Sequence, residues 1–303
     1  MAISRAQLAK ELEPGLNALF GLEYGRYENE HSEIFDEESS DRAFEEEVML
    51  GGFSTAPSKG EGTAISFDEA RETYTARYTH ETIALAFSIT EEAIEDNLYD
   101  RLASRYTKAL ARSMAQTKQI KAAAILNNAF LAGANAIGDG VALCSSAHPS
   151  LSGNQTNLLA TAADLNETSL EQMLIDIAGL TDERGLKIAV RGTKLVIPKE
   201  LQFIAERVLN SNLRSGTADN DNNAMKNMGM LPEGAVVNHF LTDTDAYFIK
   251  TDAPNGFKYF NRAAIKTAME GDFDTGNMRF KARERYSFGV SDWRSVFGTP
   301  GAA

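Results

Sequence analysis

Three short motifs in this 303-residue sequence bring acidic, thiol or imidazole groups close together, and each is a candidate for chemistry. Asp274-Thr275-Gly276 matches the triplet that carries the catalytic aspartate of aspartic proteases. That chemistry needs two such aspartates that face each other and share a proton. Here the triplet follows Asp272-Phe273 and precedes Asn277, which is turn chemistry between two strands. The motif therefore predicts a hairpin turn.

The second motif, Asp219-x-Asp221-x-Asn223, has the spacing that opens a calcium-binding loop. Such a loop requires glycine at its sixth position and glutamate at its twelfth. Those positions hold Ala224 and Met230 here. We therefore expect a polar loop at residues 215–223 and no metal site.

The third motif places Cys144 four residues before His148. A thiol activated by an imidazole is a nucleophile, but a fold normally brings these partners together from distant segments. The pattern favours a small buried thiol beside a turn. The sequence also lacks a zinc-protease His-Glu-x-x-His motif, a phosphate-binding glycine loop and a dinucleotide fingerprint. We expect no catalytic centre, no cofactor and no metal, and keep a hydrolase using Asp274 or Cys144 as an alternative of a different class.

The composition is that of a folded, acidic protein, with 43% hydrophobic residues and a net charge of −13. The first residues lack the apolar core of a signal peptide, and no stretch approaches the length of a membrane span. One cysteine excludes an intramolecular disulfide, so folding does not depend on oxidation. This acidity disfavours tight, sequence-specific DNA binding, which needs Lys and Arg at the phosphates.

Residues 28–50 contain ten acidic residues and only one basic residue, Arg42. Such a run is commonly a solvated or flexible face. The alternative is an extended arm that lies on a basic surface of the same or a neighbouring subunit. Both interpretations remain open from the sequence.

A long two-stranded loop is predicted before the middle of the chain. Residues 51–71 are rich in turn formers, including Pro57-Ser58-Lys59-Gly60-Glu61-Gly62. Apolar residues then recur at every second position from Tyr74 to Tyr78 and from Ile83 to Ile89, with a change of phase near Thr82. This period is typical of half-buried strands, and the phase change indicates a bulge or twist.

A very long amphipathic helix is predicted at residues 90–132, which contain neither proline nor glycine. Its length of roughly 60 Å, at about 1.5 Å per residue, exceeds the width of a small domain. Arg101, Arg105, Lys108 and Arg112 form one basic stripe on it, because they are four, three and four residues apart. The stripe is a candidate seat for the acidic run, or a plain solvated face.

Shorter elements follow the usual signals of periodicity, glycine and proline. A helix with an interruption at Pro14-Gly15 is expected within residues 4–24. Further on we expect a helix at 167–184, a buried strand at 187–197, a helix at 199–210, and strands within 236–251 and 256–282 with turns at 243–245 and 272–277. The fold class is therefore α+β.

Several segments, in order, resemble the tailed-bacteriophage major head proteins with the Hong Kong 97-type capsid fold, including the Mu-type head subunits. They lie between residues 50 and 297 and include Tyr78-Thr79-His80-Glu81-Thr82, Ile89 to Tyr99, Ser146-Ala147-His148-Pro149, Leu195-Val196-Ile197-Pro198, residues 219–224 and residues 272–289. The resemblance implies an N-terminal arm (1–48), an extended E-loop (49–88), a peripheral domain with a spine helix (89–135 and 250–303) and an axial domain (136–249).

The same resemblance implies a structural protein, a major capsid subunit that is made in the bacterial cytoplasm and becomes part of the virion. Its partners would be its own copies in pentamers and hexamers, portal and scaffolding proteins, a decoration protein, and packaged double-stranded DNA bound without sequence specificity. A cross-link through Lys59 is not expected. The candidate inter-subunit contacts are Pro57, Ser58, Lys59, Gly60, Glu61, Gly62, Arg101, Arg105, Lys108, Arg112, Asp219 and Asp221. The alternative within the same fold is an encapsulin-like bacterial shell that encloses enzymes.

Overall fold

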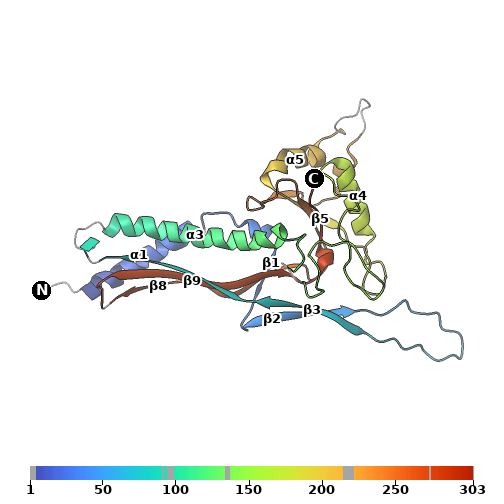
Figure 1. Cartoon of the computed structure of the whole chain (residues 1–303), viewed down its shortest axis with the longest axis horizontal. Helices are drawn as coiled ribbons and strands as arrows, with labels where there is room; N and C mark the ends of the chain where they lie inside the picture. The colour runs from blue at the N-terminus through green and yellow to red at the C-terminus, as the bar shows by residue number, and fades with distance from the viewer. Residues whose placement is uncertain are drawn as a thin grey trace.

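The computed structural model describes residues 5–90, 92–93, 99–133, 137–213, 222–272 and 274–302. The molecule has a long platform, a lobe at one end of it and a hairpin that projects below the lobe (Figure 1). The helix at the start of the described residues, α1 (Arg5–Tyr24), lies along the part of the platform that points away from the hairpin loop (Figure 1). The predicted α+β class is confirmed.

The platform is a four-stranded sheet with two helices on one face. In sheet order its strands are β1 (Asp36–Ser39), β8 (Phe257–Gly271), β9 (Met278–Val290) and β4 (Glu81–Ile89). Strand β8 runs antiparallel to β9, and β9 antiparallel to β4, whereas β1 is parallel to β8. Alternate residues of β9, such as Phe280 and Ala282, are buried beneath the helices, as the period of a half-covered strand requires.

The two helices on this face are α1 (Arg5–Tyr24) and α3 (Tyr99–Asn127). The 29 residues of α3 correspond to roughly 44 Å. The predicted long helix is confirmed for this part, whereas residues 91 and 94–98 of the predicted span lie outside the described residues. The predicted interruption of α1 was wrong, since the helix continues through Pro14. Burial of Leu16 and Phe20 against α3 and the sheet offsets the hydrogen bond that proline removes.

The lobe is built around a second sheet. In sheet order its strands are β10 (Val296–Thr299), β7 (Tyr247–Thr251), β5 (Gly192–Ile197) and β6 (Ala235–Val237). Its helices are α4 (Glu167–Ala178), η2 (Lys199–Leu201), α5 (Gln202–Asn210) and α6 (Ala224–Met228). The predicted helix at 199–210 is confirmed. The helix predicted at 167–184 ends six residues early, because Thr181 and Lys187 form a β-bridge across a turn.

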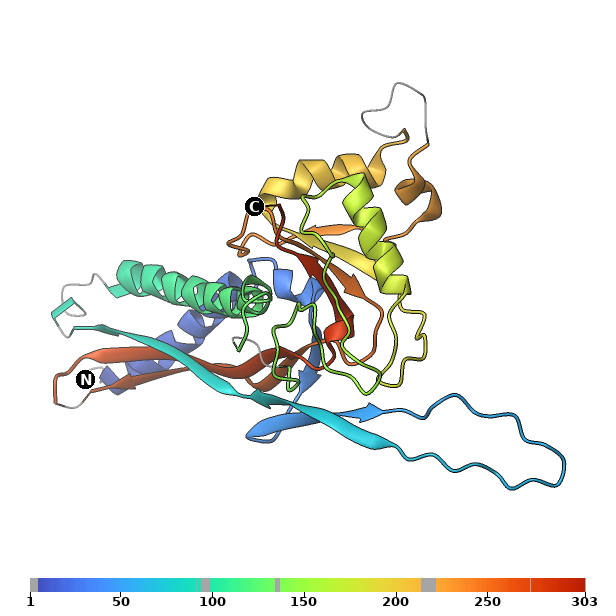
Figure 2. The same ribbon diagram turned by 45° about the vertical axis from the view of Figure 1, so that its right-hand side comes forward.

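The projecting hairpin consists of β2 (Phe44–Gly51) and β3 (Arg71–Thr79), joined by the loop of residues 52–70 (Figure 2). The sequence predicts a two-stranded loop that includes the segments around Tyr74–Tyr78 and Ile83–Ile89. The structure instead pairs β3 with β2, and β4 with β9. The phase change near Thr82 therefore marks the point where the chain leaves the hairpin and enters the platform.

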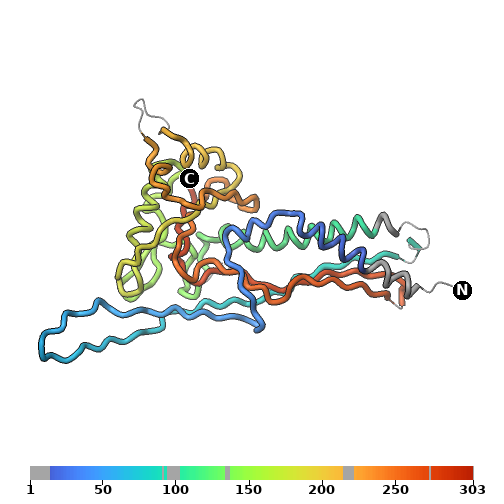
Figure 3. Tube along the Cα trace, turned by 180° about the vertical axis from the view of Figure 1, so that it is seen from behind, coloured from blue at the N-terminus to red at the C-terminus, as the bar shows by residue number. Residues whose placement is uncertain are grey.

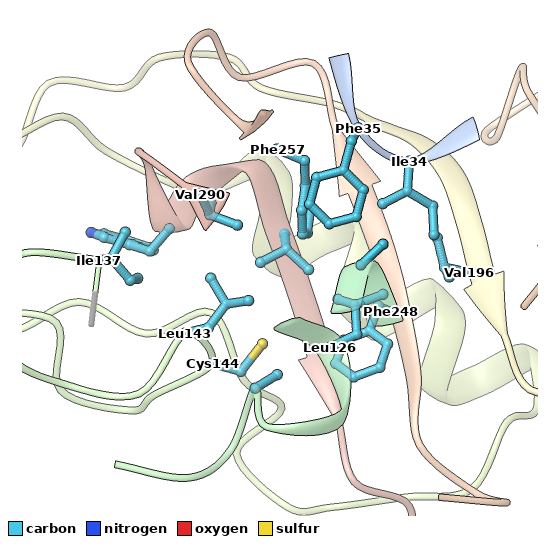
Figure 4. Close-up of a cluster of buried hydrophobic side chains, with 14 of the residues drawn as sticks. Ile34, Phe35, Leu126, Ile137, Leu143, Cys144, Val196, Phe248, Phe257 and Val290 are labelled. Atoms are coloured by element: carbon cyan, nitrogen blue, oxygen red, sulfur yellow. The ribbon is translucent and has the colours of Figure 1, made fainter. Parts of the chain in front are cut away.

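The lobe and the platform share one hydrophobic core. Figure 4 shows Phe35 of the N-terminal segment beside Phe257 of β8, Ile34 beside Val196 of the lobe, and Leu126 of α3 beside Phe248 of the lobe. Val290, at the end of β9, closes the platform side of this cluster. Because segments from all parts of the chain meet here, the lobe is fixed to the platform by burial and not by a flexible linker.

A buried ionic network around the short helix η3 (Trp293–Ser295) fixes the same junction. The Arg294 side chain is only 3% exposed, and its guanidinium lies 2.9 Å from Glu183 and 3.3 Å from Asp292. Its Nε donates to the Thr181 carbonyl at 2.8 Å. Burial raises the pKa of Asp292, and Arg294 opposes that shift. The cation therefore keeps two buried carboxylates paired in a site from which water is excluded.

We predict that Arg294→Met destabilises the subunit by roughly 3–5 kcal/mol, because it leaves Glu183 and Asp292 buried without their cation. The measurement is the free energy of unfolding in urea. The control is Arg26→Met, which removes an ion pair with Glu23 in which the arginine side chain is 72% exposed, and which we expect to cost about 0–1 kcal/mol. Equal losses in the two variants would contradict a structural role for the network.

Candidate assembly interface

The Asp274-Thr275-Gly276 motif, a candidate for protease chemistry, forms a turn in the structure. Asp274, Thr275 and Gly276 form part of the turn that joins β8 to β9, where Gly276 has φ 68°. The Thr275 hydroxyl donates to Asp272 at 2.7 Å, and the Gly276 amide donates to the Asp272 carbonyl at 2.9 Å. This is a closed hairpin turn, as the sequence predicts.

Cys144 and His148 are both structural. Cys144 is buried in the junction core, and this burial raises the pKa of its thiol, so a reactive thiolate is disfavoured. The His148 ring nitrogens lie 2.6 Å from Asp139 and 3.1 Å from Asn157, and the ring stacks on Trp293 at 4.4 Å. With both nitrogens engaged, the imidazole has no free position from which to activate a nucleophile.

Asp219 and Asp221 of the calcium-loop motif lie outside the described residues. Among the residues that the structure does describe, no group of three or more His, Cys, Asp or Glu side chains is placed to hold a metal ion. In the same part of the chain, no helix combines the length and the apolar character needed to cross a membrane.

The loop of the hairpin is the most unusual surface of the subunit. Residues 52–70 are all exposed and contain no strand, and Pro57, Ser58, Lys59, Gly60, Glu61 and Gly62 form its tip. Phe67 is 95% exposed, Ile65 69% and Phe53 60%. Large apolar side chains gathered on a projecting loop are characteristic of a surface that another molecule covers. The turn formers in the sequence indicate the tip but not these three residues, although apolar residues within a turn-rich segment are a visible signal.

The two ends of the loop are held together. The Ser54 hydroxyl and amide both donate to the Asp68 carboxylate, at 2.6 and 2.7 Å, and hold the pKa of Asp68 down to about 2. Arg184 of the lobe donates to the carbonyls of Gly52 and Glu69. These contacts set the direction in which the loop leaves the body (Figure 2).

Buried side chains attach the base of the hairpin to the platform. The Tyr78 ring packs on Gly289, where a Cβ atom would lie only 2.6 Å from the ring. The Tyr78 hydroxyl hydrogen-bonds to Ser291, and Glu47 of β2 forms an ion pair with Lys258 of β8. Gly289 is therefore required for the close approach of hairpin and sheet.

His80 occupies the hinge between hairpin and platform, as the single residue between β3 and β4. It is 5% exposed, and its ring nitrogens lie 2.9 Å from the hydroxyls of Ser287 and Ser40. Burial lowers the pKa of His80; Arg285 and Arg262 lower it further, and Glu45 opposes them. The hinge is thus built for a neutral imidazole.

Among the described side chains, the acidic segment forms no ion pair with the α3 stripe of its own subunit. Figure 3 shows this segment running along α3 and then turning towards the hairpin. Its carboxylates contact cations of the sheets instead, in the pairs Glu33–Lys194, Asp36–Lys250, Glu38–Lys258 and Glu47–Lys258, and Glu30 contacts His239. The sequence could not predict these lysines, because they lie at least 160 residues away and meet the segment only through the sheet topology.

Arg105, Lys108 and Arg112 are exposed on α3, and none of them has an ion pair in the described part of the chain. Arg112 lies over the ring of Tyr27 at 5.9 Å. The side chain of Arg101 lies outside the described residues. The stripe therefore remains a candidate contact for another molecule, and its pairing with the acidic segment of the same or a neighbouring subunit stays a prediction.

Comparison with known proteins finds a matching protein family and solved structures with a similar fold. The phage capsid protein family matches residues 73–298. Among solved structures, the capsid of the cyanophage P-SCSP1u is similar, with TM-score 0.57, 12% identity and coverage of 88% of this chain and 86% of that one. The capsid of Myoviridae phage XM1 gives TM-score 0.53 and 14% identity, covering 89% of each chain. A virus-like particle from Pyrococcus furiosus gives TM-score 0.51 and 9% identity, covering 94% and 97%.

The fold is thus the Hong Kong 97-type capsid fold, as the sequence predicts. The family match spans well over half of the sequence, and this chain belongs to the phage capsid protein family. A search of curated proteins finds no match. The narrower likeness to Mu-type head subunits stays a prediction.

We predict that the subunit loses stability as the pH falls below about 6.5, the ordinary pKa of histidine. The folded state holds the pKa of His80 below that of the unfolded chain, so the unfolded state binds more protons in this range. The measurement is the free energy of unfolding in urea at pH 7.5 and pH 5.5. His80→Gln keeps polar atoms at the hinge and should show a smaller loss between the two pH values. The same loss in both proteins would exclude His80 as the source.

Proposed function

We propose that this chain is the major capsid subunit of a tailed-phage head, a component of the virion. Its copies would form pentamers and hexamers that close into an icosahedral shell around double-stranded DNA. The observation that carries the proposal is the projecting hairpin, whose apolar side chains Ile65 and Phe67 are exposed in the single subunit. A loop of this kind is suited to a heterologous contact, which generates closed rings and shells when its rotation closes.

The domain assignment is part of this proposal. The hairpin would serve as the E-loop, α3 as the spine helix of a peripheral domain with the platform sheet, and the lobe as the axial domain around the capsomer axes. Residues 1–48 would form the arm. The hairpin tip, the α3 stripe and Asp219 with Asp221 would lie at contacts between subunits.

The net negative charge of the subunit supports the proposal that the shell contains DNA without binding it tightly. A net charge of −13 disfavours tight adhesion to a polyanion, so packaged DNA would stay mobile and be held without sequence specificity. Portal, scaffolding and decoration proteins are proposed partners on the strength of the family alone.

The second candidate is a bacterial shell that encloses enzymes. The similarity in fold to the Pyrococcus furiosus virus-like particle favours it, at 9% identity. The two candidates differ in contents, since a phage head fills with DNA and a protein container fills with protein.

The test is negative-stain electron microscopy of the protein produced alone and purified without denaturant. We expect closed shells, or rings with five- and six-fold outlines. If only small particles appear, the experiment is repeated with a candidate scaffolding protein. Small particles in both preparations would overturn the assembly function, and shells filled with protein in the native host would favour the second candidate.

We predict that deletion of residues 57–62, or Phe67→Ser, leaves the subunit folded but weakens the shells. Phe67 contributes almost nothing to its own fold at 95% exposure, so its replacement should change the free energy of unfolding by less than about 0.5 kcal/mol. Shell stability is measured as the urea concentration at which shells dissociate. Phe67→Leu, which keeps an apolar side chain, is the matched control. Shells of unchanged stability in the serine variant would show that the loop is not a clamp.

A further inference from the structure

A cleft of about 260 Å³ lies at the hinge, between α3 and the platform sheet. We call it the hinge cleft. Its lining comes from the two strands that meet at the hinge, from α3 and from β9, and includes Thr79, Glu81, Lys121, Ala124, Tyr286 and Phe288. A molecule bound in the hinge cleft therefore contacts the base of the hairpin and the rigid body of the subunit at the same time.

The hydroxyl of Tyr286 is the feature that points to a ligand. Tyr286 lines the cleft and is only 1% exposed, and in the described part of the chain its buried hydroxyl has no hydrogen-bond partner. Buried polar groups are nearly always paired, because an unpaired one costs free energy. Burial raises the pKa of Tyr286, and the neighbouring Glu284 raises it further, so the hydroxyl keeps its proton and can donate. An acceptor atom in the cleft would satisfy it.

The other lining groups favour a flat, neutral molecule. The rings of Tyr286 and Phe288 offer apolar surface, with their centroids 5.5 Å apart and their planes at 71°. A further aromatic ring can pack on such a pair by its edge or its face. The two charged lining residues, Lys121 and Glu81, form an ion pair with each other, so neither charge is left for a ligand.

The remaining hydroxyl of β9 in this region is already engaged. Ser287, which also lines the cleft, lies 2.9 Å from a ring nitrogen of His80. The cleft thus combines apolar walls with a single buried donor that needs an acceptor. A few placed polar groups within a largely apolar concavity are characteristic of small-molecule sites.

We propose that the hinge cleft binds a small, neutral aromatic molecule that carries a hydrogen-bond acceptor, to which the Tyr286 hydroxyl donates. The bound molecule links α3 to the residues on either side of His80, and so restricts movement of the hairpin against the platform. This inference goes beyond the proposed function, because it concerns a ligand of the single subunit and does not require assembly.

The test uses coumarin as the probe, since it is neutral, has two fused rings and carries a carbonyl acceptor. Naphthalene, which has two fused rings and no acceptor, is the matched control ligand. Affinities for the purified protein are measured by saturation-transfer NMR titration. We expect coumarin to bind the wild-type protein and to slow amide hydrogen exchange at residues 79–81.

Two variants locate the site. Tyr286→Phe removes only a hydroxyl without a partner, so the thermal unfolding of the subunit should change little. It should weaken coumarin binding about tenfold and leave naphthalene binding unchanged. Ala124→Leu fills the cleft and should weaken the binding of both molecules at least about tenfold. Its control is Ala109→Leu, at an exposed alanine of the same helix, which should change neither affinity.

Each other result overturns the inference. Absence of coumarin binding to the folded wild-type protein would mean that the cleft holds only water. An equal effect of Tyr286→Phe on both molecules would exclude the hydroxyl as the donor, and unchanged binding to the Ala124→Leu variant would place the probe elsewhere. These readouts are independent of assembly: shells without coumarin binding would refute this inference alone, and coumarin binding without shells would leave only the proposed function refuted.

Discussion

The ion pair between Arg294 and Glu183 is the constraint on which the rest of the structure depends. It lies where the last strand of the platform enters the lobe, beside the stacked rings of His148 and Trp293. The two bodies share a core there, but apolar burial alone tolerates small rotations, whereas a buried arginine with fixed partners does not. A subunit that must close a shell needs a fixed angle between its lobe and its platform, because an error at each contact accumulates around a ring.

The hairpin extends the same rigidity outward. Tyr78 on Gly289, the Glu47–Lys258 pair and the buried His80 attach its base to the platform, so the exposed apolar loop has a defined direction before any partner binds. Pre-organisation lowers the entropic cost of association, so modest apolar contacts suffice for binding. The subunit is a folded body whose remaining unsatisfied surfaces are oriented for other copies.

Much of the local structure was predictable from the sequence. The turn around Asp274-Thr275-Gly276, the buried Cys144 and the helix after Pro198 follow from turn chemistry, side-chain character and periodicity, all of which act within a few residues. The predictions that were wrong depend on distant partners. Pro14 does not interrupt α1, because Leu16 and Phe20 pack against another helix. The strand at Glu81–Ile89 pairs with β9, almost two hundred residues later, and not with its neighbour in the chain.

The sequence by itself determined the α+β class, the long helix, the turn-rich loop and membership of the phage capsid protein family, because these are carried by local patterns and by the order of matching segments. Only the tertiary structure decided which cations receive the acidic segment, and which face of the platform stays open. The acidic run and the cations of β9 are both visible in the sequence. Their partners, however, depend on strand register, since a shift of one residue would turn every side chain of β9 to the opposite face.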